Sequence, residues 1–572
     1  MNIRRIGALI LLAMGAVFFT SQTPSDLSAQ DTKAEKKALR MKLREEKLKA
    51  EAEAAKAAEA AKTAEKPIVK MTPTETKPSN PLDVKKVAKL IDAEINKELA
   101  KAKIEPSSRS SDAEYLRRAS LDITGVIPAP DKVESFQTNS DPDKRAKLID
   151  ELLSSSNYGR HLADIWGNQM YVVDSENRFV TKEPLVKYLT ATFNGNKPWD
   201  RMAHEILTAT GEQEKNGEVT YYMANRGVDK MTDTVGKLFL GVQIQCAQCH
   251  NHPFTHWKQA EYWGMAQFFY KVNAVVQRNA KTEVAGKVEE IAKPQRKINP
   301  LPESAKNVSA KFLGADAPKL DNAKPLRPVL ADWICTAENP FFSKSMVNRV
   351  WAQFFGKGMV NPIDDLSDEN TPSHPELLNG LAKEFASGGF DLKQLIRAIC
   401  LTDAYQRTSV PTPGNKADTV LYSHMAVKVM TPEQLYDSIA LVVGDPSAGG
   451  ARPAGKTPRG AATSPRDRFA AFFMGSENAK ATEYEAGIPQ ALRLMNNPKL
   501  SGSPNLLNTL SKAGDKPEKI IDRLFRMTIS RQPNEAETKK LTDYIAKAPD
   551  AKTAYSDILW ALMNSSEFTL NH

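Results

Sequence analysis

The stretch Pro142-Asp-Lys-Arg-Ala-Lys-Leu-Ile-Asp-Glu-Leu-Leu153 decides the fold class that we expect for this chain. Its apolar residues Leu148, Ile149, Leu152 and Leu153 recur at the spacing of one helix face, and most of the other positions are charged. Proline fits the first turn of a helix, because the N–H that it lacks would have no partner there. The stretch therefore predicts an amphipathic helix that begins at Pro142 and buries one face.

The same helical period recurs on both sides of this stretch. In the first half of the chain it covers residues 84–91, 115–121, 158–173, 199–210 and 261–270. In the second half it returns over residues 377–385, 392–399, 517–529, 535–546 and 555–564. Residues 273–324 have no sustained helical period and predict short strands or an irregular connector. We expect a mainly α fold in which two helical domains, 81–272 and 325–572, are joined by this connector.

Polar residues mark the start of two helices in the second domain. Asp391 precedes an apolar helical pattern and is a preferred N-cap residue, since its carboxylate can accept a free backbone N–H. Ser373-His-Pro-Glu376 matches a capping box, in which the serine and the glutamate satisfy free amides reciprocally. We predict that Asp391 and Ser373 cap the two helices.

The N-terminus has the layout of a secretory signal peptide. Met1 to Arg5 is basic, Ile6 to Phe19 is apolar and uncharged, and small and polar residues continue to Gln30. The apolar run is too short for an ordinary membrane span, and no later segment is a candidate span. Residues 31–80 predict a charged helix or disordered segment followed by a Pro/Thr-rich linker. We expect signal peptide 1–30 to export the protein to the periplasm, cell envelope or exterior, with retained anchoring as the alternative.

Charge and motif content narrow the function classes. The chain has 78 Lys and Arg against 69 Asp and Glu, but both signs are spread along it, so the sequence does not predict a nucleic-acid partner. The sequence contains no nucleophile elbow, phosphate loop or dinucleotide fingerprint. It therefore gives no case for a hydrolase or a nucleotide enzyme, and whether the protein is an enzyme stays open.

One pentapeptide carries specific chemistry, Cys246-Ala-Gln-Cys-His250. Covalent haem c needs two thiols to bond its vinyl groups and a neighbouring imidazole to bind the iron, and this spacing supplies all three. Haem c is attached to exported proteins, which agrees with the signal peptide. We predict that Cys246 and Cys249 hold a haem and that His250 is its proximal ligand.

The pentapeptide also has rival interpretations. His252 and His256 follow it closely, so Cys246, Cys249, His252 and His256 could form a tetrahedral zinc or iron site. The gap between the second cysteine and the first of these histidines is shorter than in a zinc finger. A redox-active disulfide is a further possibility, although no βαβ pattern surrounds it.

The remaining cysteines do not form a disulfide framework. Cys400 adjoins the inward face of its helix and is expected to be a buried thiol. Cys335 follows Trp333-Ile334, and a bond between Cys335 and Cys400 is possible in an exported protein.

A haem at the pentapeptide would have a second axial position. His252 cannot reach it, because two residues of chain do not span the ring. The freer candidates are Met223, Met231, Met265, His161 and His204. An open position would instead permit small-ligand or peroxide chemistry. The aromatic residues around the motif could wall a haem edge or belong to an ordinary core; they are Phe254, Trp257, Trp263 and Phe268.

Three further groups of polar residues have structural and functional interpretations. Asp364-Asp365 and Asp368-Glu369 precede His374 and could bind calcium or act as acid and base, but a solvated loop before a capping box is the favoured interpretation. Two other groups are expected in helices. Asn348, Arg349 and Trp351 would fix helix packing, whereas Arg117, Arg118 and Asp122 could form a buried ion pair.

Several of these stretches together resemble a known family. Residues 115–128 and 246–254 resemble the first domain of a planctomycete secreted, cytochrome-like two-domain family of unknown function, domain of unknown function 1549 followed by domain of unknown function 1553. Residues 348–351, 362–365, 372–378 and 561–568 resemble its second domain. The resemblance covers most of the chain from about residue 81, and its cytochrome label implies haem at the same pentapeptide.

Two functional hypotheses follow from the sequence. The first is an exported c-type cytochrome-like protein with a single covalent haem, which transfers electrons to or from an envelope partner protein. The second is a non-catalytic envelope scaffold or binding protein, in which the cysteine segment holds zinc or iron or is purely structural. A haem enzyme with an open iron position is a third, weaker hypothesis.

Overall fold

The computed structural model describes residues 81–171, 180–278, 284–291, 303–321, 323–444, 464–473, 488–497, 500, 506–507 and 514–572. They belong to one compact unit, Lys77–His572. The predicted signal peptide and the charged segment before residue 81 lie outside the described residues. None of the helices in the described ranges is both long and apolar enough to cross a membrane.

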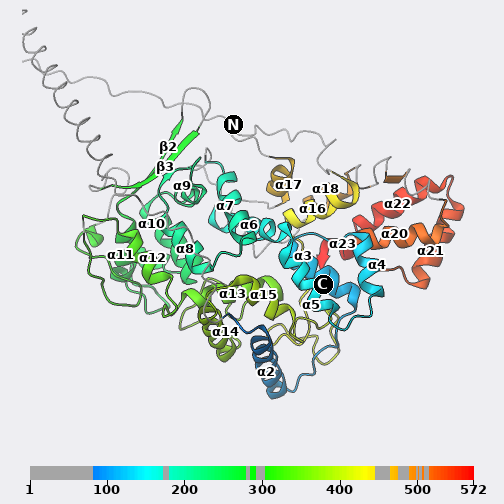
Figure 1. Cartoon of the computed structure of the whole chain (residues 1–572), viewed down its shortest axis with the longest axis horizontal. Helices are drawn as coiled ribbons and strands as arrows, with labels where there is room; N and C mark the ends of the chain where they lie inside the picture. Colours follow the sequence, from blue (N-terminus) through cyan, green and yellow to red (C-terminus); the bar gives the residue numbers. More distant parts are fainter. Residues whose placement is uncertain are drawn as a thin grey trace, which may run out of the picture. The chain divides into compact units, whose positions relative to one another are not determined.

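The first half of the chain is helical, as predicted (Figure 1). Its longest helix, α2, covers Val84–Ala102. Predicted helix 142–153 is α5 (Lys144–Ser154), which begins after Asp143 rather than at Pro142, and Leu148, Ile149 and Leu153 are buried on it. The other helices are α3 (Asp112–Thr124), α4 (Pro130–Thr138), α6 (Ser156–Met170), α7 (Glu183–Asn194), α8 (Trp199–Thr208), α9 (Thr220–Ala224), α10 (Val228–Val235) and α11 (Gln259–Ala266).

Short helical turns and a small sheet complete the first half and enter the predicted connector. The turns are η1 (Gly217–Val219), η2 (Gly236–Leu240), η3 (Gln245–Gln248), η4 (Gln267–Phe269) and η5 (Glu303–Ala305). Strands β1 (Gly211–Glu212), β2 (Val272–Arg278) and β3 (Val284–Glu290) form an antiparallel sheet in the order β1-β3-β2. Val288 at its centre pairs with Gly211 on one side and with Ala274 on the other. The connector therefore begins with the predicted short strands.

The second half is helical again and ends in a short strand. Its helices are α12 (Arg327–Ile334), α13 (Phe342–Phe355), α14 (Pro375–Ser387), α15 (Leu392–Cys400), α16 (Pro432–Val443), α17 (Pro465–Phe473), α18 (Ile488–Met495), α20 (Pro517–Ile529), α21 (Glu535–Lys547), α22 (Ala551–Met563) and α23 (Ser566–Thr569). Figure 1 shows α20, α21 and α22 side by side. Strand β4 (Lys428–Val429) pairs with β5 (Leu570–Asn571) near the C-terminus.

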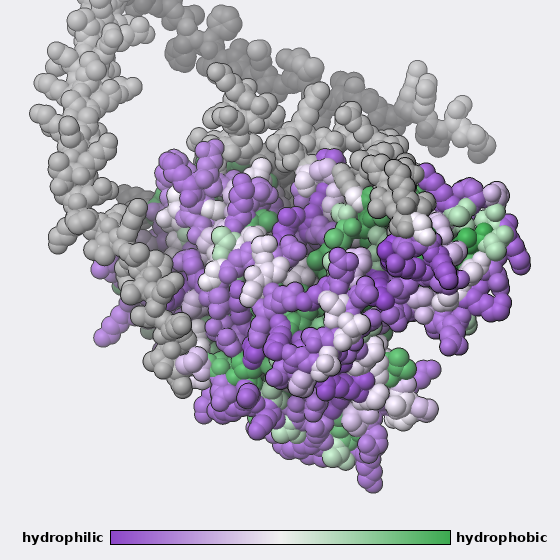
Figure 2. All heavy atoms as spheres, turned by 45° about the vertical axis from the view of Figure 1, so that its right-hand side comes forward, coloured by the Kyte–Doolittle hydropathy of each residue, from purple (hydrophilic) through white to green (hydrophobic). Residues whose placement is uncertain are grey.

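The two helical regions, the first at residues 81–272 and the second at residues 325–572, share one hydrophobic core. This core runs from Leu82 to Met425 in the sequence, and it stacks Trp199 of the first region on Phe342 of the second with ring centroids 6.1 Å apart. A second core joins Leu121 and the neighbouring Ile127 to the C-terminal helices. On the face in Figure 2, hydrophilic residues predominate and apolar residues appear as patches between them. Because burial is shared, each region depends on the other for part of its hydrophobic stabilisation.

Buried arginines of α3 bind the second region. Arg117 donates to the carbonyl oxygens of Thr528 (3.0 Å) and Phe568 (2.7 Å). Arg118 donates to those of Tyr405 (2.7 Å) and Arg407 (2.9 Å). These carbonyl oxygens replace the hydrogen bonds to water that the guanidinium groups lose on burial. The bonds also join α3 to the second region.

Asp122 does not pair with these arginines, which corrects the expected ion pair. It pairs instead with Lys428 of β4. The polar residues of α3 therefore join the two regions.

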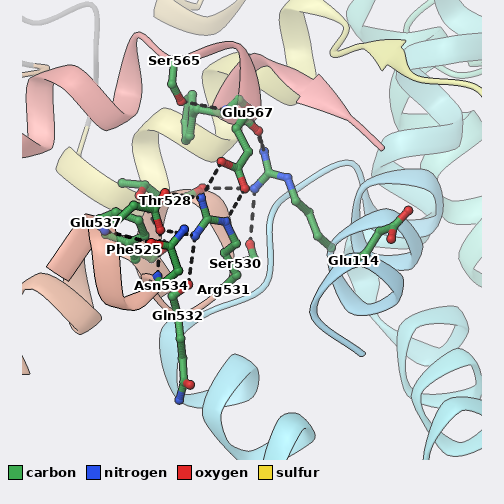
Figure 3. A network of polar contacts seen from close by, with 12 residues as sticks. Glu114, Phe525, Thr528, Ser530, Arg531, Gln532, Asn534, Glu537, Ser565 and Glu567 are labelled. Carbon is green, nitrogen blue, oxygen red and sulfur yellow. Dashed lines mark hydrogen bonds and ion pairs between the residues drawn. The ribbon is translucent and has the colours of Figure 1, made fainter. Parts of the chain in front are cut away.

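In the adjoining network of Figure 3, Arg531 lies between Glu537 and Glu567 and binds both carboxylates through its guanidinium nitrogens. Arg531 thereby joins α21 to α23 within the second region.

Candidate functional site

A π-helical turn leads into the cysteine motif. Helix α10 continues into the π-helix η2, which ends at Gly241 with φ +67°. A Cβ atom on Gly241 would lie 2.9 Å from Leu366 Cδ1 and from Ser345 Oγ, so only glycine fits this position without a shift. π-Helical turns occur frequently at functional sites. We name residues 241–258 the cysteine loop.

The cysteine motif lies on the surface of the cysteine loop. Cys246 belongs to the 3-10 turn η3, Cys249 follows its end, and both are exposed free thiols. The two thiols are three residues apart, which is about one turn of a 3-10 helix. Ala247 between them is buried and anchors the turn to the core. Two thiols are thereby presented together to solvent.

His250 is also exposed, and its ring contacts the backbone of the next residue. Nδ1 lies 2.7 Å from the carbonyl oxygen of Asn251. A carbonyl oxygen can only accept, so this contact assigns the proton to Nδ1 and leaves the Nε2 lone pair for a ligand. Metal-binding histidines commonly donate their other ring nitrogen to a carbonyl in this way. The imidazole therefore suits a role as an iron ligand.

Helix α11 supports the cysteine loop from behind. The Gln259 side chain donates to the carbonyl oxygens of Gln248 (3.1 Å) and Cys249 (2.9 Å). Trp263 Nε1 donates to the same Gln248 oxygen over 3.1 Å. The Asn251 side chain in turn accepts the backbone N–H of Gln259 over 3.0 Å. These bonds fix the backbone on which the thiols and the imidazole sit.

An acidic loop of the second region borders the cysteine loop, and we define it as residues 361–370. Its Leu366 N–H donates to the Gly241 carbonyl over 2.7 Å, and its Asp364 accepts the Gln243 side chain over 2.8 Å. A further contact joins exposed residues of the two loops: His256 Nδ1 lies 2.9 Å from Asp368 Oδ2. The sequence favoured a solvated loop for these carboxylates, and their position beside the motif arises from tertiary contacts.

The structure does not bring together the four residues of the predicted zinc or iron site. His252 Nδ1 accepts the backbone N–H groups of Phe254 (3.3 Å) and Thr255 (3.1 Å). His256 points its Nδ1 at Asp368 instead. Within the described ranges, no group of three or more His, Cys, Asp or Glu side chains could hold a metal ion. The same finding applies to the calcium interpretation of the acidic loop.

The candidate sixth ligands occupy different parts of the fold. Met231 and Met265 are buried on α10 and α11, the two helices that contact η3. Met223 is buried on α9 against Gly286 of β3. The remaining two candidates are histidines with other neighbours. His161 is buried on α6, where burial lowers its pKa to about 4, and His204 lies 3.0 Å from Asp332.

The aromatic residues around the motif divide into core and surface. Trp257, Trp263 and Phe268 are buried, and Phe268 stacks on Phe312 with ring centroids 5.5 Å apart. Phe254 is 77% exposed. Of these four residues, three therefore belong to the core, which was the alternative interpretation, and Phe254 alone projects into solvent beside the motif.

Two buried polar groups near Cys249 were missed by sequence analysis. Burial raises the pKa of Asp233 on α10 to about 7, with Lys237 opposing and Asp229 adding to the shift. The pKa of the Tyr262 hydroxyl on α11 is also raised, first by burial and then by the charges of Asp233, Asp229 and Cys249. Asp233 is an unremarkable helix residue in the sequence, and only packing reveals its burial.

The other two cysteines are not joined. Cys335 is a half-buried free thiol, and burial together with Asp200 and Asp332 raises its pKa. Cys400 is a fully buried free thiol, as predicted, and burial together with Asp122 raises its pKa. Their separate charged neighbours agree with two unpaired thiols, which corrects the suggested disulfide.

The fold and the site define a mainly helical protein that presents a Cys-x-x-Cys-His turn on its first region and borders it with a loop of its second. Residues 90–274 match the family model PSCyt2, described as protein of unknown function (DUF1549), and residues 326–485 match PSD1, described as protein of unknown function (DUF1553). The chain belongs to this two-domain family of planctomycete cytochrome-like proteins, which confirms the resemblance. Neither a curated protein nor a solved structure matches the chain.

Proposed function

We propose that this protein is an exported c-type cytochrome-like protein that carries a single haem on Cys246 and Cys249 and transfers electrons in the cell envelope. The observation that carries the proposal is the exposure of two free thiols, one on η3 and one directly after it, before an imidazole whose Nδ1 contacts a carbonyl oxygen and so leaves Nε2 available. The name of the first domain's family is consistent with this assignment.

Each residue of the motif has a distinct task in this proposal. The thiols of Cys246 and Cys249 would hold haem through its two vinyl groups, and His250 Nε2 would be the ligand to its iron. The Asn251 carbonyl keeps the His250 ring in the required tautomer. When bound, haem supplies an iron that gains or loses one electron. Gln259 holds the backbone of the turn in place.

The exposure of the motif favours electron transfer as the role of this site. Both cysteines and His250 are exposed, and Phe254 projects beside them. A cofactor attached here has an edge at the surface, where a partner protein can approach through the small interface that is usual for redox encounters. The partner in this proposal is a redox protein of the cell envelope.

Export belongs to the same proposal and rests on the N-terminal sequence. Residues 1–30 have the basic, apolar and polar parts of a signal peptide. An exported location suits a Cys-x-x-Cys-His protein, since covalent haem is attached outside the cytoplasm. The periplasm or cell envelope is therefore the proposed location.

A non-catalytic scaffold is the second candidate function. The observation that favours it is the network of protein contacts that holds the cysteine loop: the backbone at η3 is bound by Gln259 and Trp263, and three side-chain or backbone contacts join the loop to the second region. In this case the motif is a structural surface turn of an envelope binding protein, with or without zinc or iron.

The deciding experiment is haem attachment. We expect the full chain, expressed with a haem c maturation system and then denatured, to retain haem in a pyridine haemochrome assay. The variant Cys246→Ala/Cys249→Ala should retain none, whereas Cys335→Ala, which alters a cysteine outside the motif, should retain it fully. Absence of haem from the unchanged chain, under conditions that mature a control cytochrome, refutes the proposal.

Two measurements on the same sample separate the alternatives. Elemental analysis for zinc and iron tests the non-haem site, in which Cys246, Cys249, His252 and His256 are the ligands. Carbon monoxide binding to the reduced haem protein tests the enzyme hypothesis. A spectrum that does not change with carbon monoxide indicates that both axial positions are filled, and it favours electron transfer.

A further inference from the structure

One buried arginine of the second region holds the segment that leads into the cysteine loop. Arg349 lies on α13, and its Nη2 donates to the Lys237 carbonyl of η2 over 2.5 Å. Its Nη1 donates to Gln169 Oε1 over 2.9 Å. Arg349 is therefore a bridge from α13 to both α6 and the π-helical turn. Arg349 belongs to the second region but contacts η2, the segment of the first region that leads into the cysteine loop.

The neighbouring residue on α13 holds the acidic loop. Asn348 Nδ2 donates to the Val360 carbonyl over 2.8 Å, and Asn348 Oδ1 accepts the Val360 N–H over 3.0 Å. A longer bond of 3.4 Å reaches the Ile363 carbonyl. Two adjacent residues of one buried helix thus bind η2, which leads into the cysteine loop, and the start of the acidic loop.

Asp364 connects these two supports. Burial lowers the pKa of Arg349 to about 10, and the charge of Asp364 opposes this shift, so the carboxylate stabilises the buried guanidinium. The same carboxylate accepts the Gln243 side chain over 2.8 Å, three residues before Cys246. Asp364 therefore acts on the second-region support and on the cysteine loop at once.

We propose that Arg349 and Asp364 are positioning residues of the cysteine-motif site, through which the second domain sets the geometry of the loop that carries Cys246, Cys249 and His250. What this loop holds rests on the proposed function; that it is held by the second domain does not. The proposal gives the large second domain a role at a site whose side chains all come from the first.

The test compares two site variants with a matched buried arginine. Arg349→Lys keeps the charge but loses the two-armed contact, and Asp364→Asn keeps an acceptor but loses the charge. Arg327→Lys is the control, because Arg327 is also buried and donates to carbonyls, those of Leu207 and Ala209, whereas Arg349 donates to η2 at the entry to the cysteine loop. The variants are made in the full chain without haem, and amide hydrogen exchange is measured by mass spectrometry.

We expect Arg349→Lys and Asp364→Asn to accelerate exchange in residues 241–258 and 361–370 by about tenfold or more, as for loss of one hydrogen bond made by a charged group. Arg327→Lys should leave these two segments at the rate of the unchanged chain. Exchange in 241–258 that rises no more in the site variants than in Arg327→Lys overturns the proposal.

A second readout uses the haem-loaded protein and separates this proposal from the first. Asp364→Asn should raise the midpoint potential, because removal of a nearby negative charge destabilises the ferric form. Arg327→Lys should not change the potential. If the chain binds no haem, the proposed function fails while the exchange result still decides the positioning role. If haem binds and exchange in residues 241–258 is unaltered, the positioning role fails alone, whatever the potential.

Discussion

Asp122 Oδ1 lies 2.6 Å from Lys428 Nζ, and this ion pair joins helix α3 of the first region to strand β4 of the second. The aspartate side chain is only 3% exposed. Tyr405 and Asn571 donate to the same carboxylate over 2.8 and 2.7 Å. One side chain thus joins segments that are more than 280 residues apart in the sequence.

Breaking this pair should destabilise the whole chain. Asp122→Ala leaves the Lys428 ammonium without its partner, and we expect the free energy of unfolding to fall by about 3 kcal/mol. Urea denaturation followed by circular dichroism measures the change. The control is Lys539→Ala, which removes an exposed pair with Asp543 and should cost less than about 1 kcal/mol. Equal losses of unfolding free energy in the two variants would show that the buried pair contributes no more to stability than the exposed pair.

The four thiols should differ in reactivity. Cys246 and Cys249 are exposed, whereas Cys400 is fully buried and Cys335 is half-buried with a raised pKa. In the folded haem-free protein, iodoacetamide should alkylate Cys246 and Cys249 first and Cys400 only after denaturation, because a buried thiol is neither accessible nor ionised. Peptide mass spectrometry over time gives the order. Early alkylation of Cys400 would contradict the structure.

His161 should make stability fall in acid. Its folded pKa of about 4 lies below that of an exposed histidine, because burial disfavours the charged ring. The unfolded state therefore takes up a proton first, and stability present above pH 6.5 is lost as the pH falls towards 4, by roughly 3 kcal/mol. His161→Gln should remove this part of the pH dependence. Unfolding free energies at pH 7.5, 5.5 and 4.5 provide the comparison.

Asp233 should have the opposite pH dependence. Burial raises its folded pKa to about 7, so the folded protein keeps a proton that the unfolded chain loses. Asp233 therefore lowers stability as the pH rises from about 4 to 7, by roughly 2–4 kcal/mol. Asp233→Asn should be more stable than the unchanged chain at pH 8 and equally stable near pH 4. A lower stability of the variant at pH 8 would refute this assignment.

Gly241 should tolerate alanine less well than another glycine with positive φ. Gly241→Ala adds the left-handed backbone cost of about 1–2 kcal/mol and a clash with Leu366 and Ser345. Gly514→Ala is the control, because Gly514 has φ +60° but, among the described residues other than its chain neighbours, no heavy atom lies within 4 Å of the added methyl group. Thermal unfolding of both variants should give the larger loss for Gly241→Ala. An equal loss of stability in the two variants would mean that Leu366 and Ser345 move to accommodate the methyl group without further cost.

Two helix starts illustrate how far local sequence patterns reach. Asp391 caps α15 as predicted, with its Oδ1 accepting the Gln394 N–H over 3.0 Å. The predicted capping box at Ser373 is wrong, since α14 begins at Pro375 with His374 as N-cap and no side-chain cap. Ser373 Oγ instead lies 3.0 Å from His374 Nδ1, and its backbone N–H donates to the Met359 carbonyl. A tertiary contact overrides the local motif here.

The candidate site divides in the same way. Cys246, Cys249 and His250 could be named from the sequence, because their chemistry depends on spacing within a single turn. Asp364 and Arg349 could not be assigned to the site, since each lies about a hundred residues from the motif and reaches it only through α13 and the acidic loop. Asp233 could not be recognised either, because its altered pKa comes from burial.

The sequence by itself therefore determined the helical class and the thiol–imidazole motif of this protein. Both depend on residues within a few positions of one another, where helical periodicity and turn geometry act. The tertiary structure alone decided that the two regions share a core, that Asp122 pairs with Lys428, and that the acidic loop borders the cysteines. These pairings join distant segments, and the packing of buried surfaces selects them, which a local pattern does not encode.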